Sequence, residues 1–481
     1  MPGGEKVDFD KRLENQIEKD IQHLRRLGYA QELYRTIGGF SNFAITFSVI
    51  SILSGLMTLY GYGLSLVGPF SIWTWAIVGL FQLMVALALG DIASIYPLAG
   101  GVYKWTGRLG NPHVGWFCGC FSLLGWLACT AGIQFGMGIF LTAYLGFELS
   151  PLNILLITAV IIAAHSIINV YGIRLVAKIT DFSVGVHIIG AAVLVGLLLI
   201  FGRNNPLEYI LHVGNVPQGM IIFNFIQALL MSAWTLTAFD ASTNVSEESI
   251  NPSKVVPWGM VVAVLCSWVL GSLLLLSLNL SLPGLAETLD SGFPAALYVI
   301  RTALGTTIYK FITIFILLAQ FTAGLSSQTV SIRIIYSFSR DKGLPFSNLW
   351  KNVSPKYSTP VYSVLLISGA TLLLCIFAPS LQMITSLSTI GLYFAYAITM
   401  AVAISERRKI QVNHGPFHLG RFRLPIQVIS FLWTIFITFI MVVPPIGKGG
   451  KVFLLATVFI TVYYFVAMRK QLGAEFKYTL E

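Results

Sequence analysis

Long apolar stretches recur along almost the whole chain, and they constrain its fold more than any other feature. Of the 481 residues, 56% are hydrophobic and only 10% are charged, which is too apolar for a soluble domain. About 20 consecutive apolar residues are enough for a helix to cross a bilayer. No alternating pattern of the kind found in membrane barrels is present, so the stretches predict helices.

We therefore predict an all-α integral membrane protein with twelve transmembrane helices. Their expected ranges are 39–63, 69–93, 113–145, 152–170, 177–201, 219–242, 257–281, 307–338, 360–378, 382–404, 425–444 and 450–468. Residues 1–38 form a polar arm with apolar residues at helical spacing, which predicts an amphipathic helix on the membrane surface or under the bundle. Residues 469–481 form a tail.

The positive charges predict the orientation of these helices. With the N-terminus in the cytoplasm, 25 of the 30 Lys and Arg residues fall on the inner side and 5 on the outer side. Such a bias is typical of cytoplasmic segments. We expect both termini in the cytoplasm of a multi-pass protein of the plasma membrane, which would be the inner membrane in a bacterium. The scattered charges do not predict a nucleic-acid partner.

Two of the predicted helices have interruptions at similar depth. The first has small and hydroxyl residues at its middle, namely Ser48, Ser51, Ser54, Gly55 and Thr58. The sixth has Trp234, Thr235, Thr237 and Asp240. Paired breaks near the midplane of two halves indicate a transporter site, because a half-helix offers N–H groups to an anion and carbonyls to a cation. The alternative is that small residues merely let helices pack closely.

Ionisable side chains are costly inside a bilayer and are therefore candidates for function. Asp91 and Asp240 fall near the cytoplasmic ends of their helices. Two interpretations are open: each carboxylate pairs with an Arg or Lys residue in a gate, or it is simply solvated at the membrane interface. His187 lies deeper, and a neutral ring bonded to a neighbouring helix is the alternative to a functional role.

Four stretches resemble the amino acid–polyamine–organocation transporter superfamily, specifically its amino acid/choline transporter family, which includes GABA permeases. They are GDIASIYPLAGGVYKW, AFDASTNVSEES, IRIIYSFSRDKGLPFS and GPFHLGRFRLPI. Two positions depart from the family pattern: Asp91 stands where Glu is usual, and Ala238 replaces a glycine.

The resemblance implies a leucine-transporter-type fold of 5+5 inverted repeats, with two peripheral helices. The first repeat would be 39–201, the second 219–404, and the peripheral helices 425–468. The substrate would lie between the two breaks. The residues expected to bind it are Ser51, Ile52, Leu53, Ser54, Gly55, Trp234, Thr235, Leu236, Thr237 and Ala238. Phe239 and Trp126 are candidates for aromatic lids in gating, although plain packing would also explain them.

The sequence is compatible with either a proton or sodium as the coupling ion. Ser326 and Ser327 resemble a hydroxyl pair that contributes to a sodium site in sodium-coupled relatives. His187 falls where several proton-coupled relatives have a lysine, and imidazole has an ordinary pKa near 6.5 that suits proton loading. We favour the proton and His187. No cofactor other than this ion is expected.

The favoured function is a secondary active transporter for a small amino acid or GABA-like zwitterion. The alternatives are a polyamine or choline carrier, a sodium-coupled symporter and an amino acid exchanger. An enzyme is disfavoured because no nucleophile–base pair or metal-ligand cluster stands out in the sequence. The expected partners are the substrate and membrane lipid, and a monomer would be sufficient.

Overall fold

The computed structural model describes residues 3–378, 380–412, 414–443 and 448–475, and helices make up most of this part of the chain. The helices are α1 Gly3–Arg26, α2 Gly39–Val49, α3 Met57–Val67, α4 Ile72–Ile95, α5 Gly101–Leu109, α6 Pro112–Tyr144, α7 Pro151–Tyr171, α8 Ile173–Phe201, α9 Ile221–Thr235, α10 Ala241–Asn244, α11 Pro252–Leu280, α12 Leu285–Asp290, α13 Ala295–Arg340, α14 Ser347–Trp350, α15 Val361–Phe377, α16 Leu381–Ser405, α17 Arg407–Val412, α18 Arg423–Val442, α19 Lys448–Tyr463 and α20 Arg469–Glu475. Shorter turns are η1 Ile52–Leu56, η2 Gly68–Ser71, η3 Leu207–Leu211, η4 Gln218–Met220, η5 Ser246–Glu248, η6 Gly420–Phe422 and η7 Tyr464–Met468.

The described residues contain 9 helical stretches that are long and apolar enough to cross a membrane. One of them, Gly39–Ile95, covers the first two predicted spans. The shorter apolar helix Val361–Phe377 covers the ninth predicted span, and α9 covers most of the sixth. The all-α membrane architecture is therefore confirmed.

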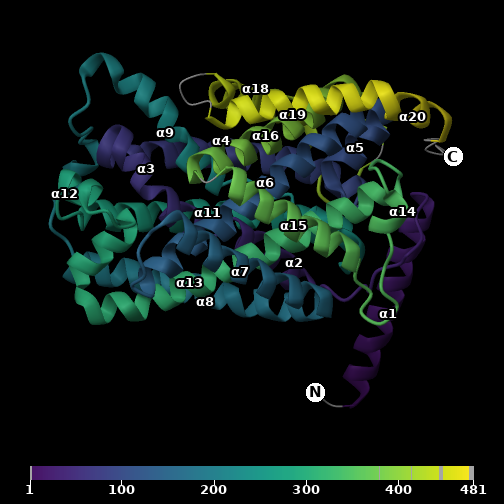
Figure 1. Cartoon of the computed structure of the whole chain (residues 1–481). Coiled ribbons are helices and arrows are strands. Elements are labelled where there is room, and N and C mark those ends of the chain that lie inside the picture. Colours follow the sequence, from purple (N-terminus) through teal and green to yellow (C-terminus); the bar gives the residue numbers. More distant parts are fainter. Residues whose placement is uncertain (1–2, 379, 413, 444–447, 476–481) are drawn as a thin grey trace.

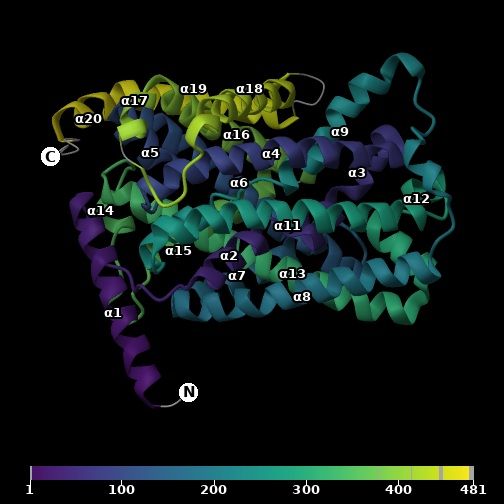
Figure 2. The same cartoon turned by 180° about the vertical axis from the view of Figure 1, so that it is seen from behind.

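The long helices run roughly side by side, and both terminal helices lie at one end of the bundle (Figures 1 and 2). We call this the proximal end and the opposite one, near α12, the distal end. At the proximal end α1 runs across the long helices, and its first turns extend past the edge of the bundle.

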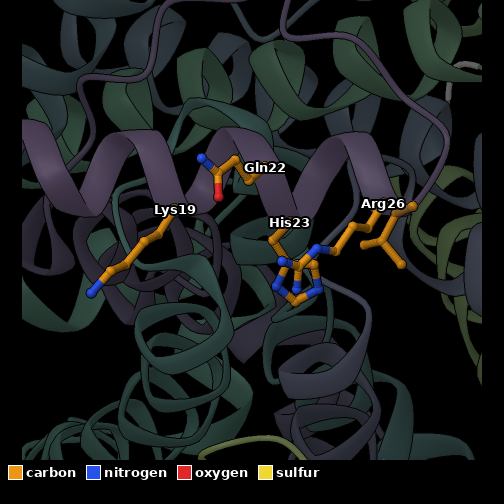
Figure 3. A pocket seen from close by; sticks show the side chains of 5 residues that line it. Lys19, Gln22, His23 and Arg26 are labelled. Carbon is orange, nitrogen blue, oxygen red and sulfur yellow. The ribbon is translucent and has the colours of Figure 1, made fainter.

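Helix α1 has a basic side opposite its apolar stripe. Figure 3 shows Lys19, His23 and Arg26 on the same side of the helix, where they line a pocket of about 290 Å³ with Gln22. Burial lowers the pKa of His23 below 6.5, and the nearby Arg26 acts in the same direction. Leu24 of the apolar stripe is only 3% exposed, so α1 docks through that stripe.

Helix α6 lies at the centre of the bundle and packs along α16. The two backbones approach closely at Gly125 and Gly391, since a Cβ added to Gly391 would lie 2.8 Å from Gly125 Cα. Glycine at such a crossing removes the side chain that would hold the helices apart. In contrast, α19 leaves Leu455 and Phe459 71% and 72% exposed, as expected of a peripheral helix that faces lipid.

Candidate functional site

Two helices are interrupted near the middle of the bundle, at the positions that the sequence predicts. Helix α2 ends at Val49, and the backbone then turns at Ser51 (φ −38°, ψ 112°) before the π-helical turn η1 begins at Ile52. Helix α9 ends at Thr235, and Ala238 has a φ of 63° before α10 begins. Hydroxyl and small residues thus mark genuine breaks here and not only close packing.

A small cavity lies between the two breaks. It is lined by Val49, Gly55, Cys129, Ile133, Trp234, Thr235, Thr237 and Ala238. The space open to a water-sized sphere is only about 10 Å³, close to what one water molecule needs. A ligand larger than water would therefore bind here only after the surrounding helices move apart.

The breaks touch each other directly at Gly55. A Cβ added to this glycine would lie 2.8 Å from the Thr235 hydroxyl oxygen and 2.9 Å from the Thr235 methyl carbon. Similarly, a Cβ on Gly132 of α6 would lie 2.9 Å from the ring of Trp234. A side chain at either position would therefore force Thr235 or Trp234, both in the cavity lining, to shift.

Five of the ten predicted substrate-binding residues line this cavity: Gly55, Trp234, Thr235, Thr237 and Ala238. The other five lie beside it. Ile52 and Leu53 are buried, with Leu53 directed towards Gly190 of α8. The carbonyl of Ser54 accepts from Thr58, and that of Leu236 accepts from Gln82 at 3.0 Å. Ser51 contacts His187, as described below.

Three cavity residues were missed by the sequence analysis: Val49, Cys129 and Ile133. Cys129 and Ile133 are four residues apart and therefore share one face of α6. The sequence contains this spacing, but α6 has apolar and small residues on every side. Nothing in the pattern alone indicates which face meets the breaks.

His187 of α8 reaches the break after α2. Its Nε2 lies 2.6 Å from the Ser51 hydroxyl, and its Nδ1 lies 2.8 Å from the Ser183 carbonyl. An Nδ1–H donated to that carbonyl leaves Nε2 of a neutral ring to accept from Ser51, a tautomer assigned from the hydrogen bonds. The imidazole is therefore linked to the backbone position where the helix opens.

The two serines expected at a sodium site face different neighbours. The Ser327 hydroxyl lies 2.8 Å from the Thr130 hydroxyl of α6, so it belongs to the α6–α13 contact. The Ser326 hydroxyl is buried and has no hydrogen-bond partner among the described residues. One turn before it, Thr322 lies 2.5 Å from the hydroxyl of Ser183, which also contacts His187.

The aromatic candidates lie on the proximal side of the break in the sixth predicted helix and do not line the cavity. Trp126 donates its indole N–H to Asp240 at 3.2 Å, and Tyr396 donates its hydroxyl to the same carboxylate at 2.5 Å. Phe239 packs on Tyr396 with ring centroids 5.3 Å apart. Asp240 is fully buried, and the carboxylate has neutral donors here instead of an Arg or Lys partner.

Asp91 forms a buried ion pair at the proximal end of α4. Its carboxylate accepts from Arg423 of α18 at 2.5 and 3.0 Å. Ser94, one turn later, accepts from the Phe417 N–H at 3.0 Å. The first and last motifs of the sequence therefore meet in space.

The other two motifs meet each other at the same end. Glu247 pairs with Arg340 at 2.7 and 2.8 Å, and Glu248 pairs with Arg333 at 3.0 Å. Burial raises the pKa of Glu247, but Arg340 outweighs it, so the pKa lies below its ordinary value. Two charge pairs therefore tie the segment after α10 to the proximal half of α13.

Lys104 of α5 forms an ion pair with Asp341 directly after α13. Burial lowers the pKa of Lys104 to about 8, although Asp341 acts in the opposite direction. The Lys104 ammonium also donates to the Tyr29 hydroxyl at 2.6 Å and lies 4.0 Å from the centroid of that ring. Arg340 lies 4.5 Å from the same centroid.

The segment between α1 and α2 closes over this end. The Gln31 amide donates to the Glu247 carbonyl at 2.8 Å, and the Ile37 N–H donates to the Glu248 carbonyl at 2.8 Å. The buried Arg35 donates to the carbonyls of Ser246 and Ser249. Backbone and side-chain hydrogen bonds therefore hold this segment against the proximal end of the bundle.

Within the described residues no group of three or more His, Cys, Asp or Glu is placed to hold a metal ion. Cys118, Cys120, Cys129, Cys266 and Cys375 form no disulfide in the part of the chain that the structure describes. The chemical character of the site comes from backbone groups at the breaks, hydroxyls, one indole and one imidazole.

Comparison with known proteins gives a consistent result. A family model described as amino acid permease matches residues 37–466. The chain is 31% identical over 456 residues to the Amino-acid permease BAT1 homolog of Oryza sativa subsp. japonica, covering 88% of this chain and 87% of that protein. It is 30% identical to Amino-acid permease BAT1 of Arabidopsis thaliana, with 88% of each chain covered. It is 27% identical to the GABA-specific permease of Saccharomyces cerevisiae over 85% of this chain and 75% of that protein.

Proposed function

Since the chain belongs to the amino acid permease family, we propose that it moves a small zwitterionic amino acid or GABA-like substrate across the membrane by alternating access, coupled to protons. The family places it among transporters of the amino acid–polyamine–organocation superfamily and not among enzymes. The amino acid class follows from the family, whereas the particular substrate, the coupling ion and the direction are our proposal.

The lining of the central cavity supports a zwitterionic substrate. No lining residue carries a charged side chain, and the hydroxyls come from Thr235 and Thr237. The broken helices would then bind the two charges of the substrate, because helix N-termini attract carboxylates and helix C-termini attract ammonium groups. A polyamine or choline would instead need an acidic or aromatic cage, and among the described residues of the lining Trp234 alone is aromatic.

His187 supports proton coupling because it contacts the break itself. In the neutral ring Nε2 accepts from Ser51; a proton on Nε2 reverses this bond, so that the ring donates and the Ser51 hydroxyl must turn away. Such a reversal links the charge of the imidazole to the shape of the break that binds substrate, which is what coupling requires.

Uptake by the purified protein in proteoliposomes tests this proposal. A thermal-shift screen of amino acids, GABA, polyamines and choline first identifies a compound that stabilises the folded protein. An imposed inward proton gradient should then drive accumulation of that compound, and His187→Gln should abolish this accumulation while retaining exchange of labelled for unlabelled substrate.

His165→Gln is the matched control. His165 is also a buried histidine, but it contacts Gln134 and is away from the break. It should keep gradient-driven uptake. Accumulation that requires sodium and ignores the proton gradient would contradict the proposal, and stabilisation by choline or polyamines alone would contradict the substrate class.

We further propose that the proximal end faces the cytoplasm of a plasma-membrane protein. The excess of Lys and Arg at that end supports this orientation. One chain contains both breaks and the complete cavity between them, so a monomer is sufficient for transport.

A further inference from the structure

A larger pocket, of about 570 Å³, opens at the distal end of the bundle. Its size is typical of sites for small molecules. It lies between the end of α6 with the loop after it and the first part of α13, and aromatic rings and two cations dominate its lining. Its lining includes Tyr144, Phe293, Arg301, Tyr309 and Lys310.

Two cations line this pocket, and both side chains are solvent-exposed. In the described structure neither Arg301 nor Lys310 forms an ion pair or a side-chain hydrogen bond, and no acidic residue lines the pocket. Of the acidic groups nearby, Glu287 accepts from the Tyr298 hydroxyl at 2.7 Å. Two unpaired cations beside aromatic rings favour an anion with a small apolar part.

Tyr309 gives a second, independent indication of a ligand. Its side chain is 5% exposed, and its hydroxyl has no hydrogen-bond partner among the described residues. A buried hydroxyl without a partner is unfavourable. A carboxylate in the pocket would supply the missing acceptor, while the ring of Phe293, 6.4 Å from that of Tyr309, would cover its apolar part.

The pocket lies on the same helix faces as the central cavity. On α13, the Gln320 amide donates to the hydroxyl of Thr58, which lies one turn after Gly55 of the central cavity. Tyr309 precedes Gln320 by three helical turns, a rise of about 16 Å along α13. On α6, Tyr144 follows the cavity residue Ile133 by the same three turns. Residues separated by three turns share a face, so the pocket lies above the central cavity, towards the distal end.

We propose that this pocket binds carboxylates and captures the carboxylate of the substrate before it enters the central cavity, an inference that rests on the proposed function. Arg301 and Lys310 hold the carboxylate, and Tyr309 donates to it. The ammonium group of a zwitterion stays in solvent at this stage.

Butyrate is a suitable probe because it has the carboxylate and the apolar part without the amine. Saturation-transfer NMR on the full chain in detergent should show butyrate binding and no binding of n-butylamine. The double variant Arg301→Gln/Lys310→Gln should weaken butyrate binding about tenfold or more, and Tyr309→Phe should weaken it less. Binding should also fall as salt is raised, because exposed charges are screened.

Arg203→Gln is the matched control, since Arg203 is a cation of the same end that does not line the pocket. It should leave butyrate binding unchanged. In uptake assays the double variant should raise KM severalfold with the maximal rate kept. Butyrate binding that is unaffected by the double variant, or equally reduced by Arg203→Gln, would overturn the inference.

The two proposals can fail separately. If the protein takes up no amino acid but binds butyrate through Arg301, the transport proposal fails and the carboxylate site stands. If uptake is normal and butyrate does not bind, the site is wrong and the transport proposal stands.

Discussion

At the break after α9, the backbone of one residue, Ala238, has an unfavourable conformation. Ala238 has a φ of 63°, in the left-handed region that costs a residue with a Cβ roughly 1–2 kcal/mol. Glycine would adopt this conformation without that cost. Strain of this kind is held in place by surrounding contacts and is common at binding sites.

Ala238→Gly should therefore stabilise the folded protein by about 0.5–1 kcal/mol, because the relief of strain exceeds the added freedom of the unfolded chain. Thermal unfolding in detergent measures this. Ala228→Gly is the control within α9, where the backbone is helical, and it should destabilise by about 0.5–1 kcal/mol. Destabilisation by both substitutions would show that Ala238 is not strained.

At the scale of elements, buried ion pairs join helices that are far apart in the sequence. Asp91 and Arg423 join α4 of the bundle to α18, and their side chains are 0% and 7% exposed. The sequence is compatible with a paired or a solvated Asp91, and the structure shows it paired with Arg423. Removal of one partner from such a pair leaves an uncompensated buried charge.

Arg423→Gln should accordingly destabilise the protein by about 3–5 kcal/mol. The double variant Asp91→Asn/Arg423→Gln should recover most of this loss, since two neutral amides can bond to each other. Unfolding temperatures of the purified variants give the comparison. A double variant that is no more stable than Arg423→Gln would mean that the side chains act independently.

Over the whole molecule, the proximal end is closed by a network that unites the N-terminal segment, α5 and α13. Lys104 is central to it and is fully buried. Because its pKa is lowered from 10.5 to about 8, the unfolded chain binds more protons than the folded chain between about pH 8 and 10.5. The contribution of Lys104 to stability therefore rises with pH across this window.

The unfolding temperature of the wild type, relative to that of Lys104→Gln, should increase from pH 7.5 to 9.5. Thermal unfolding of both proteins in the same detergent checks this. A relative decrease would mean that the ion pair with Asp341 outweighs burial and holds the Lys104 pKa above its ordinary value.

The candidate site was predictable in part. Hydroxyl and small residues in the first and sixth helices indicate the breaks, and Gly55, Trp234 and Thr237 line the cavity between them. Cys129 was not predictable, because the face that α6 presents depends on how it packs against α16. The spans were predictable for a simpler reason: a bilayer requires long apolar helices whatever their arrangement.

The sequence by itself determined the membrane class, the spans and the positions of the two breaks, since these depend on local composition and on the requirement that backbone groups bond within each helix. Only the tertiary structure decided which residues meet: Asp91 with Arg423, His187 with Ser51, and Tyr144 with Arg301 at one pocket. These residues are far apart in sequence or on separate turns, and their contacts follow from helix packing, which no local pattern specifies.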